Sequence, residues 1–169
     1  MPFVEVFSSA STSLSQEKRK EISERLVSEV MEGEGAPDNE NTRSLSWLVW
    51  HEPKLWSIGG RPVQDGERPF YAVRVSMPAA SLNEEKRAEV VRRVTQVLAE
   101  ADDDPGRFYQ APPVSFVLIN EVPEGNWGSA GMVFRFPDIA SYVLKGVPGQ
   151  MSEAEVAEAF GLEGERVTS

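Results

Sequence analysis

The chain of 169 residues contains one unit twice, and this internal repeat restricts its fold more than any other feature. The first copy opens with the apolar stretch 2–6 and the second with 69–73, an offset of 69 − 2 = 67. The next blocks, 13–30 and 81–98, share seven identities in 18 positions. The matches continue in the same order at Trp47–Glu52 against Phe116–Glu121 and at Trp56 against Trp127. Chance similarity between two amphipathic helices would not give this ordered series.

Each unit has the pattern of a strand, a helix and a second strand. Helices are predicted at 14–32 and 82–100, because apolar residues recur there at helical spacing. Two strands joined by a helix of this length are parallel, with a right-handed crossover. We therefore expect an α/β fold of tandem βαβ repeats, with one four-stranded sheet and both helices on one face. The strands are expected at 2–8, 46–51, 69–76 and 114–120, with short return strands near 61–63 and 131–136.

The repeat also predicts how the chain divides. Residues 1–66 form the first βαβ unit, 67–136 the second, and 137–169 a C-terminal extension to what is one domain overall. Within the extension, residues 152–160 predict a short amphipathic helix with Ser152 as its cap. We expect the extension to pack on a neighbouring subunit or to remain mobile. The segment 33–44 has the composition of a loop.

Alternation along the first strands predicts a self-associating protein. The β-branched Val4 and Val6 suit packing beneath the helices, whereas Phe3, Phe7 and Phe70 point to the other face of the sheet. An uncovered sheet face that carries aromatic side chains is typical of an interface. We expect oligomerisation through this face.

Composition excludes several classes of function. The net charge of −10, with no basic cluster, argues against a nucleic-acid partner. No apolar run is long enough for a transmembrane helix, and the N-terminus lacks the features of a signal peptide, so we expect a cytoplasmic protein without a membrane partner. With no cysteine and one histidine, no metal site is expected.

Three stretches of the chain resemble the tautomerase superfamily. They are Met1–Val4, the helix start Leu82–Arg87, and the strand and hairpin Ile119–Gly128, which is similar to that of the 4-oxalocrotonate tautomerases. The resemblance covers about residues 2 to 135. With both units in one chain, it is similar to the fused members, which include malonate semialdehyde decarboxylase, cis-3-chloroacrylic acid dehalogenase and macrophage migration inhibitory factor. It implies a homotrimer that needs no cofactor.

The resemblance assigns the chemistry to Pro2. Removal of Met1 would expose a secondary amine. An α-amino group titrates at about 7.7–8.0, and an apolar pocket lowers that value further. A base with a pKa near neutrality is suited to moving a proton beside a carbonyl. The alternative is that Pro2 only begins the first strand. Pro69, its counterpart, is an internal amide, so each chain has one such site.

The arginines with which relatives hold carboxylate substrates are missing from the expected places. The loops 8–12 and 76–80 contain none, and Trp47 and Phe116 occupy the second-strand positions. A small dicarboxylate is therefore an unsuitable substrate, and a less polar or larger molecule is favoured.

Five other residues are candidates for substrate binding. Arg74 lies close to where fused relatives place cations, although a salt bridge with Glu5 is its alternative role. His51 could donate to a substrate carbonyl, or be structural. Arg43 and Asn120 are weaker candidates, the first in a loop and the second at the position that matches His51. Trp127 aligns with the aromatic residue that walls the proline pocket in relatives, and interface packing is compatible with that role.

These observations predict a cofactor-independent tautomerase or isomerase that acts on a small enol or 2-oxo substrate through Pro2. A hydratase, decarboxylase or dehalogenase on the same scaffold is a second possibility, against which the missing arginines argue. The alternative from another class is a non-catalytic binding or interaction protein on the same trimeric scaffold. The missing arginines and the additional C-terminal residues favour that alternative.

Overall fold

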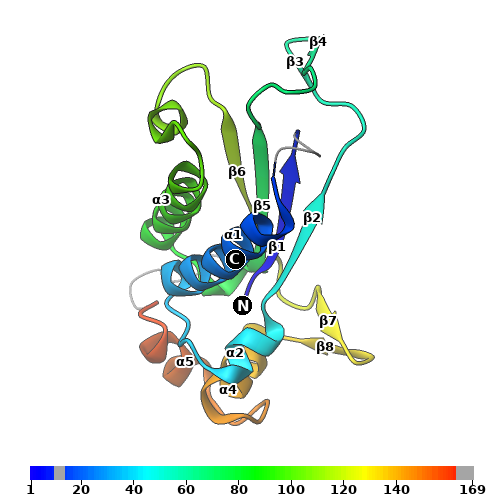
Figure 1. Ribbon diagram of the computed structural model, residues 1–169. Helices are drawn as coiled ribbons and strands as arrows, with labels where there is room; N and C mark the ends of the chain where they lie inside the picture. The colour runs from blue at the N-terminus through cyan, green and yellow to red at the C-terminus, as the bar shows by residue number, and fades with distance from the viewer. Residues whose placement is uncertain (10–13, 163–169) are drawn as a thin grey trace.

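A computed structural model of the chain describes residues 1–9 and 14–162. Its centre is a four-stranded mixed sheet in the order β2-β1-β5-β6 (Figure 1). Each repeat supplies one parallel pair, and β1 and β5 join the two pairs in antiparallel orientation. The sheet strands are β1 (Phe3–Ser8), β2 (Trp47–His51), β5 (Tyr71–Pro78) and β6 (Ser115–Val122). The α/β fold with edge-to-edge repeats is confirmed.

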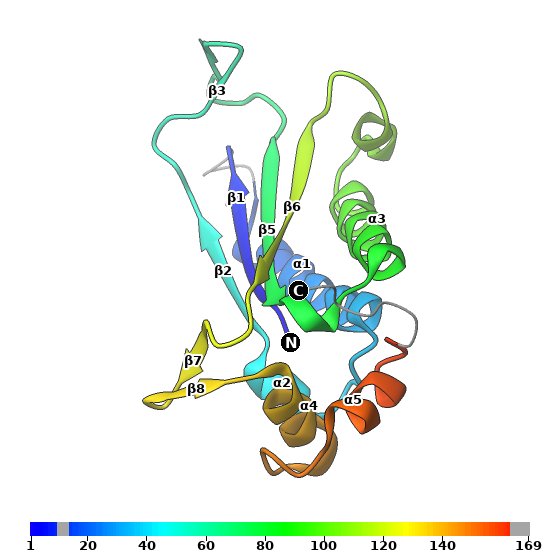
Figure 2. The same cartoon turned by 180° about the vertical axis from the view of Figure 1, so that it is seen from behind.

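Helices α1 (Gln16–Glu34) and α3 (Glu84–Glu100) cover one face of this sheet and leave the other uncovered (Figures 1 and 2). Side-chain caps fix where both helices begin. The hydroxyl of Ser15 accepts from the amide of Lys18 at 3.1 Å, and the amide oxygen of Asn83 accepts from that of Lys86 at 2.9 Å. The main hydrophobic core lies between these helices and the inward side chains of the strands, among them Val4, Val6, Val73 and Val75.

The remaining elements are short. Two hairpins project from the sheet, namely β3 (Ser57–Ile58) with β4 (Arg61–Pro62), and β7 (Trp127–Ser129) with β8 (Met132–Phe134). Two 3₁₀ turns, η1 (Ala79–Ser81) and η2 (Pro105–Tyr109), flank α3. The short helices are α2 (Glu40–Leu45), α4 (Phe136–Lys145) and α5 (Glu153–Ala159).

Two sequence expectations about these short helices were wrong. The segment 33–44 is a loop only at residues 35–39, because α1 continues to Glu34 and Asn39 caps α2 by accepting from the amide of Thr42 at 2.9 Å. The extension was expected on a neighbouring subunit or to be mobile. Instead, its residues 136–162 pack on the same chain, beside the N-terminus (Figures 1 and 2). We call these residues the C-terminal cover.

The C-terminal cover closes a second hydrophobic core, the N-terminal cluster. The first residues of the chain and the end of α1 contribute to it, together with α4 and α5. Its buried members are Met1, Met31, Ala36, Phe136, Ile139, Ala140, Val143, Val156 and Phe160. The apolar residues of α4 recur at helical spacing. The sequence expectations did not include this helix. The boundaries proposed after 66 and 136 stay a prediction, since no independent observation tests them.

Candidate active site

Pro2 lies at the head of β1, in the interior of the protein. Pro2 is buried, and its carbonyl oxygen accepts a hydrogen bond of 3.0 Å from the amide of Trp47 in β2. This bond continues the parallel pairing of β1 with β2 by one residue and holds Pro2 in line with the sheet. The position of Pro2 is therefore fixed by the central sheet rather than by a loose terminus.

The residue before it, Met1, is an integral part of the N-terminal cluster. Its side chain is 1% exposed. The terminal ammonium forms a buried ion pair with Oε2 of Glu34, the last residue of α1. The other carboxylate oxygen of Glu34, Oε1, is buried and has no hydrogen-bond partner among the described residues. Burying a carboxylate oxygen without a donor is costly, and a bound water, a ligand or a proton-transfer role would each relieve that cost.

Sequence reasoning did not identify Glu34 as a site residue. It falls in a stretch of the chain, 33–44, whose composition indicated a loop. Helix α1 continues two residues beyond the expected end at 32, and its last residue, Glu34, binds the terminal ammonium. A glutamate at the end of an amphipathic helix is ordinarily solvated, so no local signal distinguished it.

Lys86 of α3 joins Glu34 to the C-terminal cover. Its ammonium donates to the backbone carbonyl of Glu34 at 2.6 Å and also to that of Phe160, and it lies 5.8 Å from the centre of the Phe160 ring. Burial lowers the pKa of Lys86, and the negative charge of Glu34 acts in the opposite direction. The C-terminal end of the cover is thus held by the Lys86 ammonium as well as by apolar contacts.

Trp127 of β7 packs against the N-terminal cluster, as expected for a residue near Pro2. The other candidates for substrate binding lie elsewhere. Arg74 and His51 sit on the uncovered face of the sheet, where both contact Glu5. The Nη1 of Arg74 donates to Glu5 Oε2 at 3.0 Å, and the Nε2 of His51 lies 3.2 Å from Glu5 Oε1. The salt bridge weighed as the alternative role of Arg74 is therefore present.

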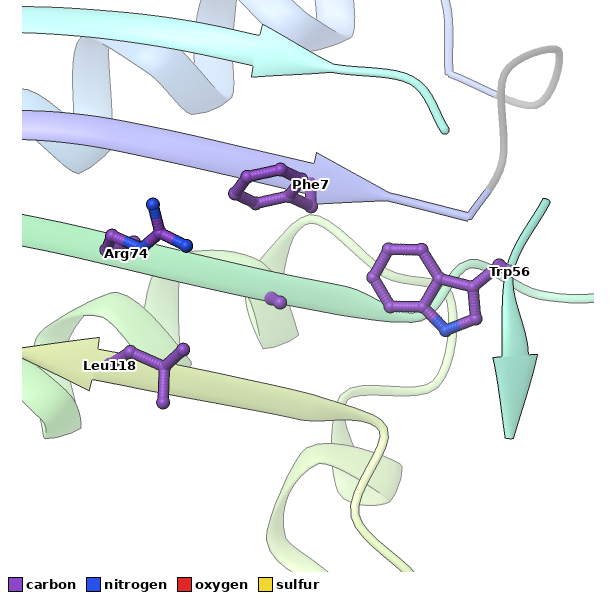
Figure 3. A pocket seen from close by; sticks show the side chains of 5 residues that line it. Phe7, Trp56, Arg74 and Leu118 are labelled. Carbon is purple, nitrogen blue, oxygen red and sulfur yellow. The ribbon is translucent and has the colours of Figure 1, made fainter. Parts of the chain in front are cut away.

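A shallow pocket adjoins this group of charges. Its lining is Phe7, Trp56, Ala72, Arg74 and Leu118, and Figure 3 shows the guanidinium of Arg74 directed toward the strand that carries Phe7. The Phe7 ring stacks on the imidazole of His51 with centroids 4.3 Å apart.

The strand register separates this pocket from Pro2. Glu5, opposite Arg74, is three residues beyond Pro2, which corresponds to ~10 Å along a strand at ~3.3 Å per residue. Asn120 lies nearer to the N-terminal end, where its amide donates to the hydroxyl of Ser76 at 3.0 Å. Arg43 is bound by Asp38 through two 2.6 Å contacts. Of the five binding candidates, the structure therefore brings only Trp127 into the cluster around Met1 and Pro2.

Similarity to known proteins agrees with this architecture. Residues 72–136 match the family model described as the tautomerase enzyme. A native fused 4-OT structure has a TM-score of 0.62 at 20% identity, over 78% of this chain and 94% of that chain. The second repeat of this chain is thus similar to a tautomerase, and the chain as a whole has the fold of a fused 4-OT.

Two further solved structures share the fold of this chain. Pt0534, in a form inactivated by 2-oxo-3-pentynoate, has a TM-score of 0.59 at 21% identity, over 76% of this chain and 92% of its own. The macrophage migration inhibitory factor-like protein of Entamoeba histolytica has a TM-score of 0.58 at 18% identity, over 79% and 98%. No curated protein sequence matches the chain significantly.

Residues 1–9 and 14–162, which the structure describes, contain neither a membrane-spanning helix nor a group of metal ligands. None of their helices is long and apolar enough to cross a membrane. Their histidines and carboxylates nowhere form a group of three that could hold a metal ion. In the N-terminal cluster a buried ion pair lies among apolar side chains.

Proposed function

We propose that this protein is a cofactor-independent tautomerase or isomerase in which Pro2 acts as general acid and base. The proposal requires that Pro2 be the first residue of the mature chain, and the small residue after Met1 favours removal of that methionine. Removal takes place on the nascent chain, before the N-terminus is enclosed. Pro2 then carries a free secondary amine at the place where the N-terminal cluster and Glu34 meet.

The observation that carries this proposal is the burial of the chain terminus beside a carboxylate. In the structure that carboxylate pairs with the ammonium of Met1, and after removal of Met1 it would lie close to the new terminal amine of Pro2. Trp127 and the apolar residues of the C-terminal cover exclude water, which strengthens electrostatic interactions with a bound enol or enolate. The match of residues 72–136 to a tautomerase family model supports the same reaction class.

The substrate class is an enol or a 2-oxo compound. Inactivation of the similarly folded Pt0534 by 2-oxo-3-pentynoate makes 2-oxo compounds the first probes. Enolisation is measured without knowledge of the product, as incorporation of deuterium from D₂O at the carbon beside the carbonyl. Proton NMR follows this exchange directly.

Blocking the Pro2 nitrogen with an N-terminal extension tests the proposal without changing any side chain of the protein. We expect the untagged protein to accelerate exchange in 2-oxopentanoate or its methyl ester. A form that carries a short uncleaved extension before Pro2 should lose the acceleration, because an amide nitrogen cannot take up a proton, and cleavage of the extension to leave Pro2 first should restore it. Equal activity of the extended and the cleaved forms would show that Pro2 is not the base.

One observation favours a non-catalytic protein as the second candidate function. Met1 fits the N-terminal cluster well, and its ammonium is paired. A chain that keeps Met1 would have a structural terminus and no free proline amine. It would then serve as a binding or interaction scaffold with the same fold.

We propose a homotrimer assembled through the uncovered sheet face. Fused 4-OT structures of the same fold are described as trimers. On this chain the face exposes Trp47, Phe116 and Leu118, at 65%, 61% and 51% of their surfaces. An exposed apolar group of this kind is typical of an interface. Trimerisation would bury Arg74 and His51 and give them a part in subunit contact.

Placing a charge on this face should therefore dissociate the trimer. We expect Phe116→Asp to elute as a monomer in size-exclusion chromatography with light scattering, because an unpaired carboxylate would be buried in the interface. Val91→Asp is the matched control, since Val91 is also an exposed apolar residue, at 37%, but lies on helix α3. A trimer that survives Phe116→Asp, or one that Val91→Asp dissociates, would place the interface elsewhere.

A further inference from the structure

The space that Met1 fills is enclosed and apolar. The thioether side chain lies among the residues of the N-terminal cluster, and it is 1% exposed. Methionine is unbranched and flexible, so the volume it leaves on removal is elongated and suited to a short apolar chain. Apolar walls of this kind are typical of small-molecule sites that contain few polar groups. Removal of Met1 would thus open a cavity directly beside the new terminus.

Two polar groups would face that cavity, and both come from the described contacts. The Pro2 nitrogen is the next backbone nitrogen after that of Met1, and the Cα atoms of the two residues are ~3.8 Å apart. Glu34 Oε2 binds the terminal ammonium in the structure, and Oε1 is buried without a partner among the described residues. A carboxylate beside an amine favours the protonated amine. The cavity would therefore hold an ammonium and a carboxylate with one acceptor site open.

We propose that Glu34 is a second catalytic residue of this site, and that the site takes a small neutral carbonyl compound with an apolar substituent. This inference rests on the proposed role of Pro2. In the enol-to-ketone direction, Glu34 Oε1 accepts the hydroxyl proton of the enol as the Pro2 ammonium delivers a proton to the neighbouring carbon. The carbon–carbon double bond becomes single, and the carbon–oxygen bond becomes double.

The two residues are restored without solvent or cofactor. After one turnover Pro2 is a neutral amine and Glu34 a neutral acid. Transfer of the proton from Glu34 to Pro2 regenerates the ion pair. Atoms and charges balance over the cycle, and the reverse sequence forms the enol from the ketone.

The charges of the site favour a neutral substrate over a carboxylate. Ten arginines form described ion pairs, none of them with Glu34. Arg135, at the head of α4, is exposed, and the nearby Lys86 donates to the carbonyls of Glu34 and Phe160. A substrate carboxylate would therefore enter an enclosed, apolar space beside Glu34 in which no described arginine is buried. Burying an unpaired charge is expensive, whereas a neutral ketone or ester avoids that cost.

The experiment compares Glu34→Gln with Glu32→Gln and Pro2→Ala in the deuterium-exchange assay. Glutamine keeps the shape of residue 34 but cannot take up the enol proton. Glu32, two residues earlier in α1, has a side chain that is 67% exposed and pairs with Arg93, so it is the matched control. Each protein is tested with 2-oxopentanoate and its methyl ester, and each rate is divided by the uncatalysed rate of the same compound. Thermal melting checks that every variant is folded.

We expect Glu34→Gln to lower kcat for the ester by about 10²-fold, as for the loss of a proton-transfer group, while Glu32→Gln leaves it unchanged. The wild-type acceleration should be at least ~10-fold larger for the ester than for the acid, which corresponds to about 1.4 kcal/mol. Should Glu34→Gln not fold, Glu34→Asp keeps the carboxylate but shortens its reach. A folded Glu34→Asp protein should then be slower by ~10-fold or more.

The possible failures are distinguishable. Suppose that Pro2→Ala loses activity while Glu34→Gln keeps all of it. That result would overturn the role of Glu34 and leave that of Pro2 intact. If only Glu34→Asp folds, full activity of Glu34→Asp would have the same meaning. A larger acceleration for the acid than for the ester would overturn the neutral substrate. Activity that survives both Pro2→Ala and Glu34→Gln would contradict the proposed function itself.

Discussion

Replacing Pro2 by alanine is expected to slow enzyme-catalysed deuterium exchange by about 10²-fold or more. General acid and base groups typically contribute 10²–10⁴-fold to a rate. Alanine also permits removal of Met1, so the variant would still begin with a free amine. That amine is primary and free to rotate about its bond to Cα, whereas the ring of proline holds the nitrogen in one orientation at the head of β1.

The second repeat provides the control for this substitution. Pro69 occupies the position that matches Pro2, but its nitrogen is an internal amide in any form of the chain. Pro69→Ala should leave the exchange rate unchanged. An unchanged rate in Pro2→Ala would exclude the proline mechanism. Equal losses in the two variants would point to a general effect on the fold.

Replacing Phe136 by alanine should remove about 3–5 kcal/mol from the free energy of unfolding. Phe136 begins α4, is 2% exposed, and packs edge-on against Phe160 with ring centroids 5.2 Å apart. The substitution opens a cavity between the two helices of the C-terminal cover, in the cluster that encloses the N-terminus. Denaturant titration of the wild type and the variant measures the difference.

Met132→Ala is the control for this second prediction. Met132 lies four residues earlier in β8 and is 58% exposed, so its truncation should change the stability by no more than about 0.5 kcal/mol. A Phe136→Ala protein as stable as the wild type would show that the cover does not pack as described. Because the cover also excludes water from Pro2, the variant should lose part of its exchange activity at temperatures where it remains folded.

The central fold could be predicted from the sequence because the repeat is redundant. The paired blocks at 13–30 and 81–98 marked the two helices, and the strands followed from their apolar pattern. The order β2-β1-β5-β6 is the arrangement expected of two βαβ units joined at their edges. Helix starts at Ser15 and Asn83 follow from local capping chemistry, which is readable in the sequence.

The candidate site was less predictable, since it depends on a contact between the two ends of the chain. Residues 137–162 have no counterpart in the repeat, so nothing in the sequence indicated which surface they would cover. Their packing against Met1 and Met31 is a long-range contact. The burial of Glu34 depends in turn on that packing. Arg74 and His51 were sensible candidates by residue type, but the strand register places them on the uncovered face with Glu5.

The most direct test of the account is the intact mass of the purified, untagged protein. We predict a mass that lacks one methionine, which would establish Pro2 as the terminal residue and its nitrogen as a free amine. A mass that includes Met1 on most molecules would contradict catalysis by Pro2 in those molecules. The buried ion pair between the terminus and Glu34 would then be a structural feature of a non-catalytic scaffold.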